Sequence, residues 1–274
     1  MKKLILALAM AFLLPAAAFA AGEKIVIGVT PFPHKDIMEV AKPILAKDGY
    51  ELVIQEFSDY VQPNVALSEG QLDANFFQHE PYLDNMNKER NLKLASVAKV
   101  HIEPLGLYSK KVKGLDSLKP GDYAAKLNAL KPSLKKAKIS VPNDPTNEAR
   151  ALRLLEKHGI AKFKAGEFIT AKDMVENPYN IEIVELDAAQ LPRTLPDVTA
   201  AVINTNFASE AKLIPSRDAI IIEDKDSPYA NIIVVRESEV NSPKTKALIK
   251  ATQSPEVKAY IEKELEPKGI LPSF

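Results

Sequence analysis

The segment Lys24-Ile-Val-Ile-Gly-Val-Thr30 indicates the fold class, because it is a run of mostly β-branched apolar residues without polar alternation. Such runs are typical of strands that are covered on both faces, as in parallel sheets. A helical pattern follows over Asp36–Lys47 and stops before Gly49, and Glu51–Phe57 returns to a strand pattern. A strand, a helix and a strand joined by a connection of this length predict the βαβ unit of an open α/β sheet.

The same alternation continues to the C-terminus, and a crossing near residue 107 suggests two lobes. Lys113–Lys136, between the two sets of elements, is rich in lysine and has weak apolar periodicity. We expect it to be a domain crossing with a solvated insertion, a partner-binding patch being the alternative. The further strands are predicted over residues 73–77, 92–97, 105–109, 138–142, 181–185, 199–203, 219–223 and 231–235, and the helices over 79–90, 145–157 and twice after residue 243.

The first twenty residues are typical of a cleaved secretory signal. Two lysines precede the apolar run Leu4–Leu14, and Ala18-Phe19-Ala20 supplies the small-x-small pattern of a cleavage site. The run is shorter than the roughly 20 residues that span a bilayer. The sequence has no cysteine, which excludes disulfides, thiolate metal sites and a lipid attached through cysteine. Acidic and basic residues balance at 36 each, so no nucleic-acid partner is expected.

Two strand-to-helix junctions concentrate polar and aromatic residues. In the first, Asp73–Leu83, only one of Phe76 and Phe77 can face a cleft, because neighbouring residues of a strand point to opposite faces. Tyr82 lies three residues beyond His79, on the same face of the predicted helix. Ligands of open α/β sheets bind beyond the carboxyl ends of strands, which favours an apolar binding wall here. Burial of these aromatic residues in the core is the alternative.

The second junction, Val141–Arg150, predicts an anion receptor. Asp144 or Asn143 can cap the helix, which places Asn147 and Arg150 in or near its first turn. Unpaired N–H groups at a helix N-terminus and a guanidinium together bind carboxylates or phosphates. The alternative is that Arg150 pairs with Glu148 or with another surface acid.

Asn204 and Asn231, each at one end of a predicted strand, offer the donor and acceptor groups that an α-amino-acid head requires, although loop capping is the default role of such residues. Catalytic patterns are absent: there is no glycine-rich phosphate loop, no G-x-S-x-G and no H-E-x-x-H. His101-Ile-Glu103 together with His79 could hold a metal ion, but no ligand spacing supports it. We therefore expect a binding protein without catalytic residues, metal or cofactor.

Several segments, in order, resemble the NlpA/MetQ-like family of methionine-binding proteins of ABC importers. The similarity runs from about Lys24 to the C-terminus. The segments that carry it are Asn75–Leu83, Val141–Leu152, Glu185–Arg193, Ala201–Thr205 and Glu223–Asn231.

The resemblance implies a periplasmic-binding-protein fold (type II-like) with two hinge crossings. The signal would be residues 1–20, lobe I 21–106, lobe II 107–228, and 229–274 the return to lobe I. It also implies methionine, with the L form preferred, as the ligand, and a membrane permease with its ATPase as partners of a monomeric protein. Tyr60, Phe77, His79 and Tyr82 would surround the thioether, Arg150 would take the carboxylate with Asn147 nearby, and Asn204 and Asn231 would fix the α-amino and carboxylate groups.

Two departures from the family pattern shape the remaining expectations. Ala21-Gly22 stands where relatives carry the lipidated cysteine, so a freely diffusing periplasmic protein is expected. The segment around Gly121–Lys136 is also longer than the usual connection. Three alternatives stay open: the same fold with another amino acid, D-methionine or a methionine-containing dipeptide as its ligand; an exported enzyme using His79 as its base; and a surface adhesin or interaction protein.

Overall fold

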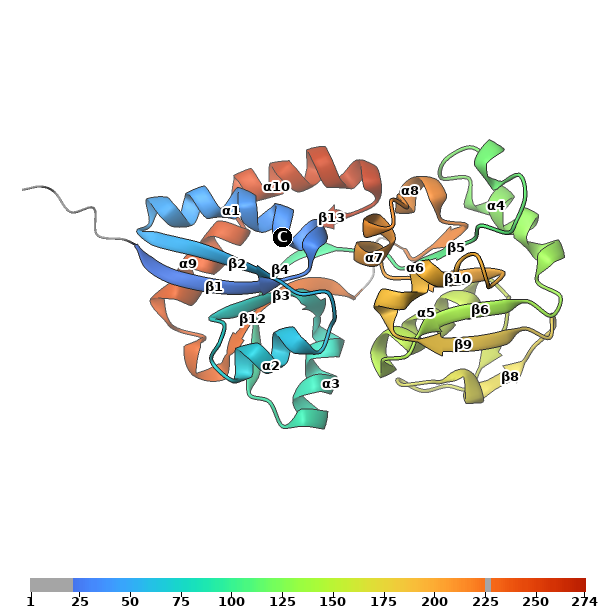
Figure 1. Ribbon diagram of the computed structural model, residues 1–274, viewed down its shortest axis with the longest axis horizontal. Coiled ribbons are helices and arrows are strands. Elements are labelled where there is room, and N and C mark those ends of the chain that lie inside the picture. Colours follow the sequence, from blue (N-terminus) through green and yellow to red (C-terminus); the bar gives the residue numbers. More distant parts are fainter. Residues whose placement is uncertain (1–21, 225–227) are drawn as a thin grey trace, which may run out of the picture.

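The computed structural model describes residues 22–224 and 228–274, so the predicted signal and part of the segment before Asn231 lie outside the described residues. The strands form two large sheets, one in each half of the elongated molecule, and a small hairpin (Figure 1). Among the described residues, no helix is both long enough and apolar enough to cross a bilayer.

The first sheet has the strand order β13-β4-β12-β3-β1-β2. Strands β1, β2 and β3 are parallel to one another, while β12 runs antiparallel to both of its neighbours, β3 and β4. Helices α1, α9 and α10 pack on one face, and α2 and α3 pack on the other. The elements are β1 (Glu23–Val29), α1 (Asp36–Lys47), β2 (Tyr50–Glu56), α2 (Gln62–Ser68), β3 (Ala74–His79), α3 (Glu80–Arg90), β4 (Leu94–Ile102), β12 (Ala230–Arg236), α9 (Pro243–Thr252), α10 (Pro255–Tyr260) and β13 (Leu271–Pro272).

The second sheet has the order β11-β5-β10-β6-β9. Strand β6 is parallel to its neighbours β9 and β10, and β5 is antiparallel to β10 and β11. The elements are β5 (Gly106–Tyr108), α4 (Tyr123–Leu130), β6 (Lys138–Pro142), α5 (Pro145–Lys157), β9 (Glu182–Leu186), α6 (Leu191–Thr194), β10 (Ala200–Ile203), α7 (Thr205–Glu210), α8 (Pro215–Asp218) and β11 (Ile221–Ile222), with the hairpin β7 (Lys162–Phe163) and β8 (Met174–Glu176) beside them.

The chain passes between the sheets twice. It leaves the first sheet at the end of β4 and enters β5 after residues 103–105, and it returns between β11 and β12. Strands β4 and β12 are antiparallel neighbours, so the end of β4, where the chain leaves the sheet, lies beside the start of β12, where the chain re-enters it. The predicted two-lobe α/β architecture with two crossings is confirmed.

The lysine-rich stretch Lys113–Lys136 packs against the core of the second lobe more extensively than its sequence indicated. Leu130 and Leu134 are fully buried in the core of the second lobe. Lys126 is 2 % exposed, and its ammonium donates to the carbonyl oxygens of Arg217 and Ala219. The expectation of a solvated insertion is therefore wrong for α4. A lysine satisfied by distant carbonyl groups leaves no periodic signal in the sequence.

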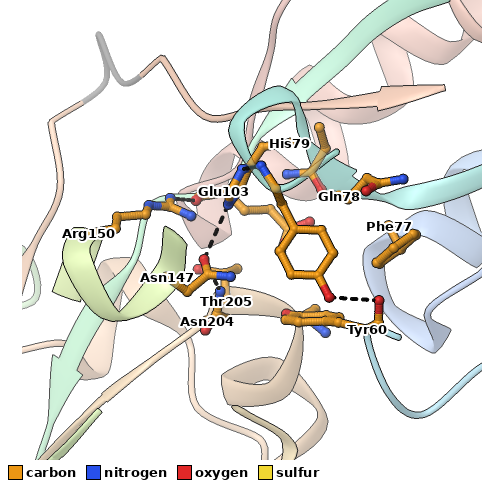
Figure 2. Close-up of a pocket in the computed structure, with 12 residues that line it drawn as sticks. Tyr60, Phe77, Gln78, His79, Glu103, Asn147, Arg150, Asn204 and Thr205 are labelled. Atoms are coloured by element: carbon orange, nitrogen blue, oxygen red, sulfur yellow. Dashed lines mark hydrogen bonds between the residues drawn. The ribbon is translucent and has the colours of Figure 1, made fainter. Parts of the chain in front are cut away.

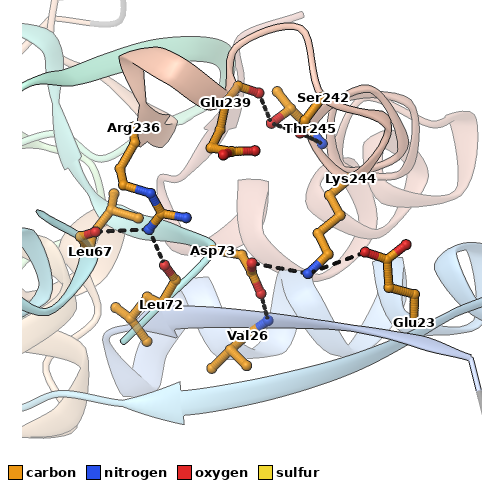
Figure 3. Close-up of polar contacts among 10 residues, drawn as sticks. All are labelled: Glu23, Val26, Leu67, Leu72, Asp73, Arg236, Glu239, Ser242, Lys244 and Thr245. Atoms are coloured by element: carbon orange, nitrogen blue, oxygen red, sulfur yellow. Dashed lines mark hydrogen bonds and ion pairs between the residues drawn. The ribbon is translucent and has the colours of Figure 1, made fainter. Parts of the chain in front are cut away.

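The C-terminal part of the first lobe is tied to its N-terminal strands by polar contacts (Figure 3). Asp73 accepts hydrogen bonds from the backbone N–H of Val26 at 2.7 Å and from Lys244 at 3.1 Å. The Nη1 atom of Arg236 donates to the carbonyl oxygens of Leu67 at 2.9 Å and Leu72 at 2.6 Å. These contacts hold β12 and α9 against α2 and β3.

We expect Arg236→Met to lower the free energy of unfolding by about 1–3 kcal/mol, because the methionine keeps the apolar stem but removes the guanidinium donor from both carbonyl groups, of which, among the described residues, only that of Leu67 keeps a backbone N–H, from Gly70 at 3.2 Å. Urea denaturation followed by circular dichroism measures the change. Arg90→Met, at an exposed position, is the matched control and should change stability by less than about 0.5 kcal/mol. Equal changes in the free energy of unfolding for the two substitutions would show that the hydrogen bonds of Arg236 do not stabilise the fold.

Candidate functional site

A narrow pocket lies between the two lobes, at the carboxyl ends of β3, β4, β6 and β10 (Figure 2). The structure brings all eight predicted site residues to its lining, although their roles toward a ligand stay predictions. Four further residues, which the sequence did not single out as ligand contacts, complete the lining. The residues are Tyr60, Phe77, His79, Tyr82, Asn147, Arg150, Asn204 and Asn231, joined by Gln78, Glu103, Thr205 and Asn206.

Strand β3 delivers the apolar wall of the pocket. Phe76 is fully buried in the core of the first lobe, and Phe77, on the opposite face, lines the pocket. His79 ends the strand and caps α3, since its Nδ1 accepts from the backbone N–H of Tyr82 at 3.2 Å. The ring centroids of Phe77 and Tyr82 are each 6.0 Å or less from that of Tyr60. These three rings enclose one end of the pocket.

Helix α5 delivers the polar end. Asp144 caps it by accepting from the backbone N–H of Asn147 at 2.9 Å, and the side-chain Nδ2 of Asn147 donates to both oxygens of the same carboxylate at 3.0 Å. The Asn147 Oδ1 atom therefore faces outward. It accepts from Asn204 Nδ2 at 3.0 Å and lies 3.2 Å from His79 Nε2. Asn147 thus bridges the two lobes.

Arg150 is fixed from two sides. Its Nε and Nη2 atoms grip the carboxylate of Glu223 at 2.7 and 2.5 Å, and Nη2 also donates to the carbonyl oxygen of Glu103 at 2.7 Å. The guanidinium carbon lies 4.4 Å from the centroid of the Tyr229 ring. No hydrogen bond from Nη1 to another described residue accompanies these contacts. The suggested pairing with Glu148 does not occur, and the acid that does pair with Arg150 is largely buried.

A buried cluster of His34, His101 and Glu103 lies next to this polar end. Strand β12 pairs with β3 and β4, and this register sets Asn231 beside His79 and His101. Glu103 Oε1 lies 2.7 Å from His101 Nε2 and 3.3 Å from His34 Nε2, which also contacts Asn231 Oδ1 at 3.0 Å. Burial lowers the pKa of His34 to about 4 and that of His101 to about 3, so both are neutral at pH 7.

The donor types of this cluster also suit a metal ion, since one atom from each of the three residues lies within 4.8 Å of the others. The grouping differs from the one that the sequence suggested, because His34 takes the place of His79. Each of the three donor atoms already takes part in a hydrogen bond or close polar contact within the protein. These three atoms therefore have partners within the protein, whereas His101 Nδ1 is buried with no hydrogen-bond partner among the described residues.

The four additional lining residues had weak or ambiguous signals. Gln78 lies inside the first junction but belongs to a polar network with Asn64 and Asn75. Thr205 and Asn206 follow Asn204 at the start of α7, where Thr205 Oγ1 donates to the carbonyl oxygen of Pro104 at 2.5 Å. Glu103 lies in the segment His101-Ile-Glu103, which suggested a metal site rather than part of a ligand pocket.

Comparisons with known proteins agree with this architecture. Residues 25–274 match the family described as NlpA lipoprotein. The D-methionine-binding lipoprotein MetQ of Salmonella typhi is 46% identical over 237 residues, which are 84% of this chain and 82% of the relative. A nutrient binding protein from Burkholderia cenocepacia, solved bound to methionine, is 46% identical with a TM-score of 0.81 and is matched over 91% of this chain and 100% of its own.

A periplasmic substrate-binding protein of an ABC transporter from Coxiella burnetii is 44% identical, with a TM-score of 0.79, over 91% of this chain and 100% of its own. The two-lobe fold is therefore that of periplasmic substrate-binding proteins. Together with the match over nearly all the described residues, this shows that the chain belongs to the NlpA lipoprotein family.

Proposed function

We propose that this protein captures methionine between its lobes and delivers it to an ABC importer, without catalysis. The observation that carries the proposal is the composition of the pocket, which has three aromatic rings at one end and arginine and asparagine side chains at the other. The 46% identity to a protein solved with methionine supports the choice of ligand. In this proposal residues 21–106 and 229–274 form lobe I and residues 107–228 form lobe II.

The hydrogen bonds inside the pocket indicate how the head of the ligand is held. Arg150 Nη1 and the amide nitrogen of Asn231 are donors for the carboxylate, since Asn231 Oδ1 already contacts His34. Asn204 uses its amide nitrogen on Asn147, which leaves its Oδ1 as an acceptor for the α-amino group. The thioether lies among Tyr60, Phe77 and Tyr82, since sulfur–aromatic contacts contribute about 0.3–1.5 kcal/mol each.

Ligand entry requires the lobes to separate. Side-chain contacts across the pocket include the hydrogen bond from Tyr60 to Asn206 at 2.6 Å and the contact of His79 with Asn147 at 3.2 Å. Both break when the lobes open and form again when they close. A ligand that touches both lobes favours the closed form, which is the form proposed to dock on the permease.

The first experiment is mass spectrometry of small molecules released by denaturing the purified protein, followed by calorimetric titration of the stripped protein with L- and D-methionine. Released methionine that rebinds supports the proposal, and the two titrations decide the stereochemistry, which matters because relatives are named for D-methionine. Release of a methionine-containing dipeptide or another amino acid would change the substrate but keep the binding function. Turnover of a bound ligand would favour the enzyme alternative, and partner binding that survives Arg150→Ala would favour the adhesin.

We also propose that the protein diffuses freely in the periplasm, although relatives are named lipoproteins, because the sequence has no cysteine to carry a lipid. Fractionation of the native host followed by intact-mass analysis tests this. Mature protein in the soluble periplasmic fraction, with the mass expected after cleavage before Ala21, is the expected result. A lipid-modified, membrane-bound form would contradict it.

Phe77→Ala should weaken L-methionine binding by roughly tenfold or more while changing alanine binding little, because it removes part of the apolar wall and leaves the polar end intact. Calorimetric titration with both amino acids measures the ratio. Phe168→Ala, at an exposed position, is the control. An equal loss for both ligands would contradict the assignment of Phe77 to the side-chain wall.

A further inference from the structure

An α-amino acid presents three groups from its Cα atom, and the charged ammonium needs the strongest acceptor. The aromatic rings account for the side chain, and Arg150 with Asn231 accounts for the carboxylate. Asn204 Oδ1 is buried and has no hydrogen-bond partner among the described residues, so it points to a donor on the ligand. A neutral amide oxygen alone does not compensate a buried positive charge.

Glu103 is placed to supply the missing charge. It lines the pocket and is only 6 % exposed, and it follows β4 at the crossing between the lobes. Its backbone oxygen accepts from Arg150 Nη2 at 2.7 Å, and its Oε1 lies 3.3 Å from His34 Nε2, which contacts Asn231 Oδ1 at 3.0 Å, so Glu103 lies beside the groups assigned to the ligand carboxylate. Because the ammonium is attached to the same Cα as the carboxylate, it would lie within reach of Glu103.

The carboxylate of Glu103 has hydrogen-bond donors around it, but no positively charged side chain of the described residues is in direct contact with it. His34 and His101 touch its Oε1, but burial keeps both imidazoles neutral. The Nε and Nη2 atoms of Arg150 donate to the carboxylate of Glu223. Toward Glu103, Nη2 donates only to the backbone carbonyl oxygen. Burial raises the pKa of the Glu103 carboxyl, as expected of an acid that lacks a counter-ion in direct contact. A ligand ammonium would supply that charge.

We propose that Glu103, together with Asn204 Oδ1, accepts the α-ammonium of the ligand and restricts the pocket to ligands with a free α-amine. His34 and His101 are positioning residues, whose Nε2–H groups orient the carboxylate from behind. This inference rests on the proposed capture of methionine. It adds a specificity determinant that discriminates against methionine analogues in which the amine is acylated or replaced by a hydroxyl group.

The test is calorimetric titration of the wild type and Glu103→Gln with L-methionine and with 2-hydroxy-4-(methylthio)butanoate, which differs from it in carrying a hydroxyl in place of the ammonium. The wild type should prefer methionine by at least 100-fold. Glu103→Gln should bind methionine at least 30-fold more weakly while its affinity for the hydroxy acid changes less than threefold. Glu148→Gln is the matched control, because Glu148 is buried outside the pocket lining and its pKa is raised to about 8, so the neutral amide resembles the protonated acid.

A purely structural role of Glu103 would weaken both ligands equally, and that result overturns the inference. Circular dichroism would show whether Glu103→Gln folds. If it does not fold, the titrations of the wild type alone test the inference, because similar affinities for methionine and the hydroxy acid would also overturn the inference. Failure of the proposed function has a different signature, since the wild type would then bind neither compound.

Discussion

Arg150→Ala is expected to weaken methionine binding by at least 30-fold and to lower the free energy of unfolding by about 3–5 kcal/mol. The first effect follows from losing the Nη1 donor to the ligand carboxylate. The second follows from the contacts that the sequence did not reveal: the substitution leaves Glu223, gripped at 2.5 and 2.7 Å in the native structure, largely buried and without its partner. Calorimetric titration and urea denaturation measure the two quantities.

A double variant separates the two roles. Replacing both members of a buried ion pair by apolar residues is often neutral or stabilising. Arg150→Met with Glu223→Leu should therefore recover much of the lost stability while methionine binding remains at least 30-fold weaker than in the wild type. A folded double variant that binds methionine with wild-type affinity would contradict the assignment of Arg150 to the carboxylate.

The control for this series is Arg153→Ala on the same helix. Arg153 pairs with Glu156 at 2.5 Å, but its side chain is 35% exposed, so the pair contributes little. Methionine affinity should stay within twofold of the wild type. If Arg153→Ala lost as much methionine affinity as Arg150→Ala, shortening any side chain of α5 would disturb binding. The effect of Arg150→Ala could then not be ascribed to the loss of Nη1.

The fold could be predicted because local patterns determined it. The strand runs are continuous and apolar, and the helices at Asp36–Lys47 and Pro145–Lys157 are amphipathic with clear stop signals, so their bounds agree with the structure. Strand β4 continues to Ile102, past the predicted end, and β11 has only two residues. In both places pairing with distant strands, rather than local pattern, sets the length.

Local sequence patterns predicted the site best where its residues are close in the chain, whereas Tyr60 was expected only from the family resemblance. His79 and Tyr82 share one junction, and Asn147 and Arg150 share another. The partner of Arg150 lies 73 residues later, and no local pattern connects the two. The role of Glu103 depends on His34 and on the return strand β12, which pairs beside it only in the folded protein. Long-range pairings of this kind decide which polar groups remain for a ligand.

Acidification from pH 7 to pH 5 is expected to remove about 6 kcal/mol of stability through three buried histidines, about 2 kcal/mol from each. Burial lowers the pKa of His34 to about 4 and those of His79 and His101 to about 3, from 6.5. Below pH 6.5 the unfolded chain therefore takes up protons that the folded protein does not. Stability falls as the pH drops from 6.5 towards these values. The raised pKa of Glu148 acts in the opposite direction and offsets part of the loss.

His101→Gln isolates one of these contributions. Glutamine keeps a donor for Glu103 but does not titrate, so the loss of stability between pH 7 and pH 5 should be about 2 kcal/mol smaller than in the wild type. Urea denaturation at several pH values gives the slope for each protein. The physical reason is local: His101 Nδ1 is buried with no hydrogen-bond partner among the described residues, and a proton there would have no acceptor.

His158→Gln is the control, because His158 is half-buried and its substitution should alter the slope less. If His101→Gln loses as much stability on acidification as the wild type, the pKa of His101 is not lowered in the folded protein, and the imidazole takes up a proton beside Glu103 between pH 7 and pH 5. Glu103 would then have a cation of its own, and the reason for assigning the ligand ammonium to it would disappear. The pH slope of a single histidine variant, measured without ligand, therefore also tests the charge balance on which the selection for a free α-amine depends.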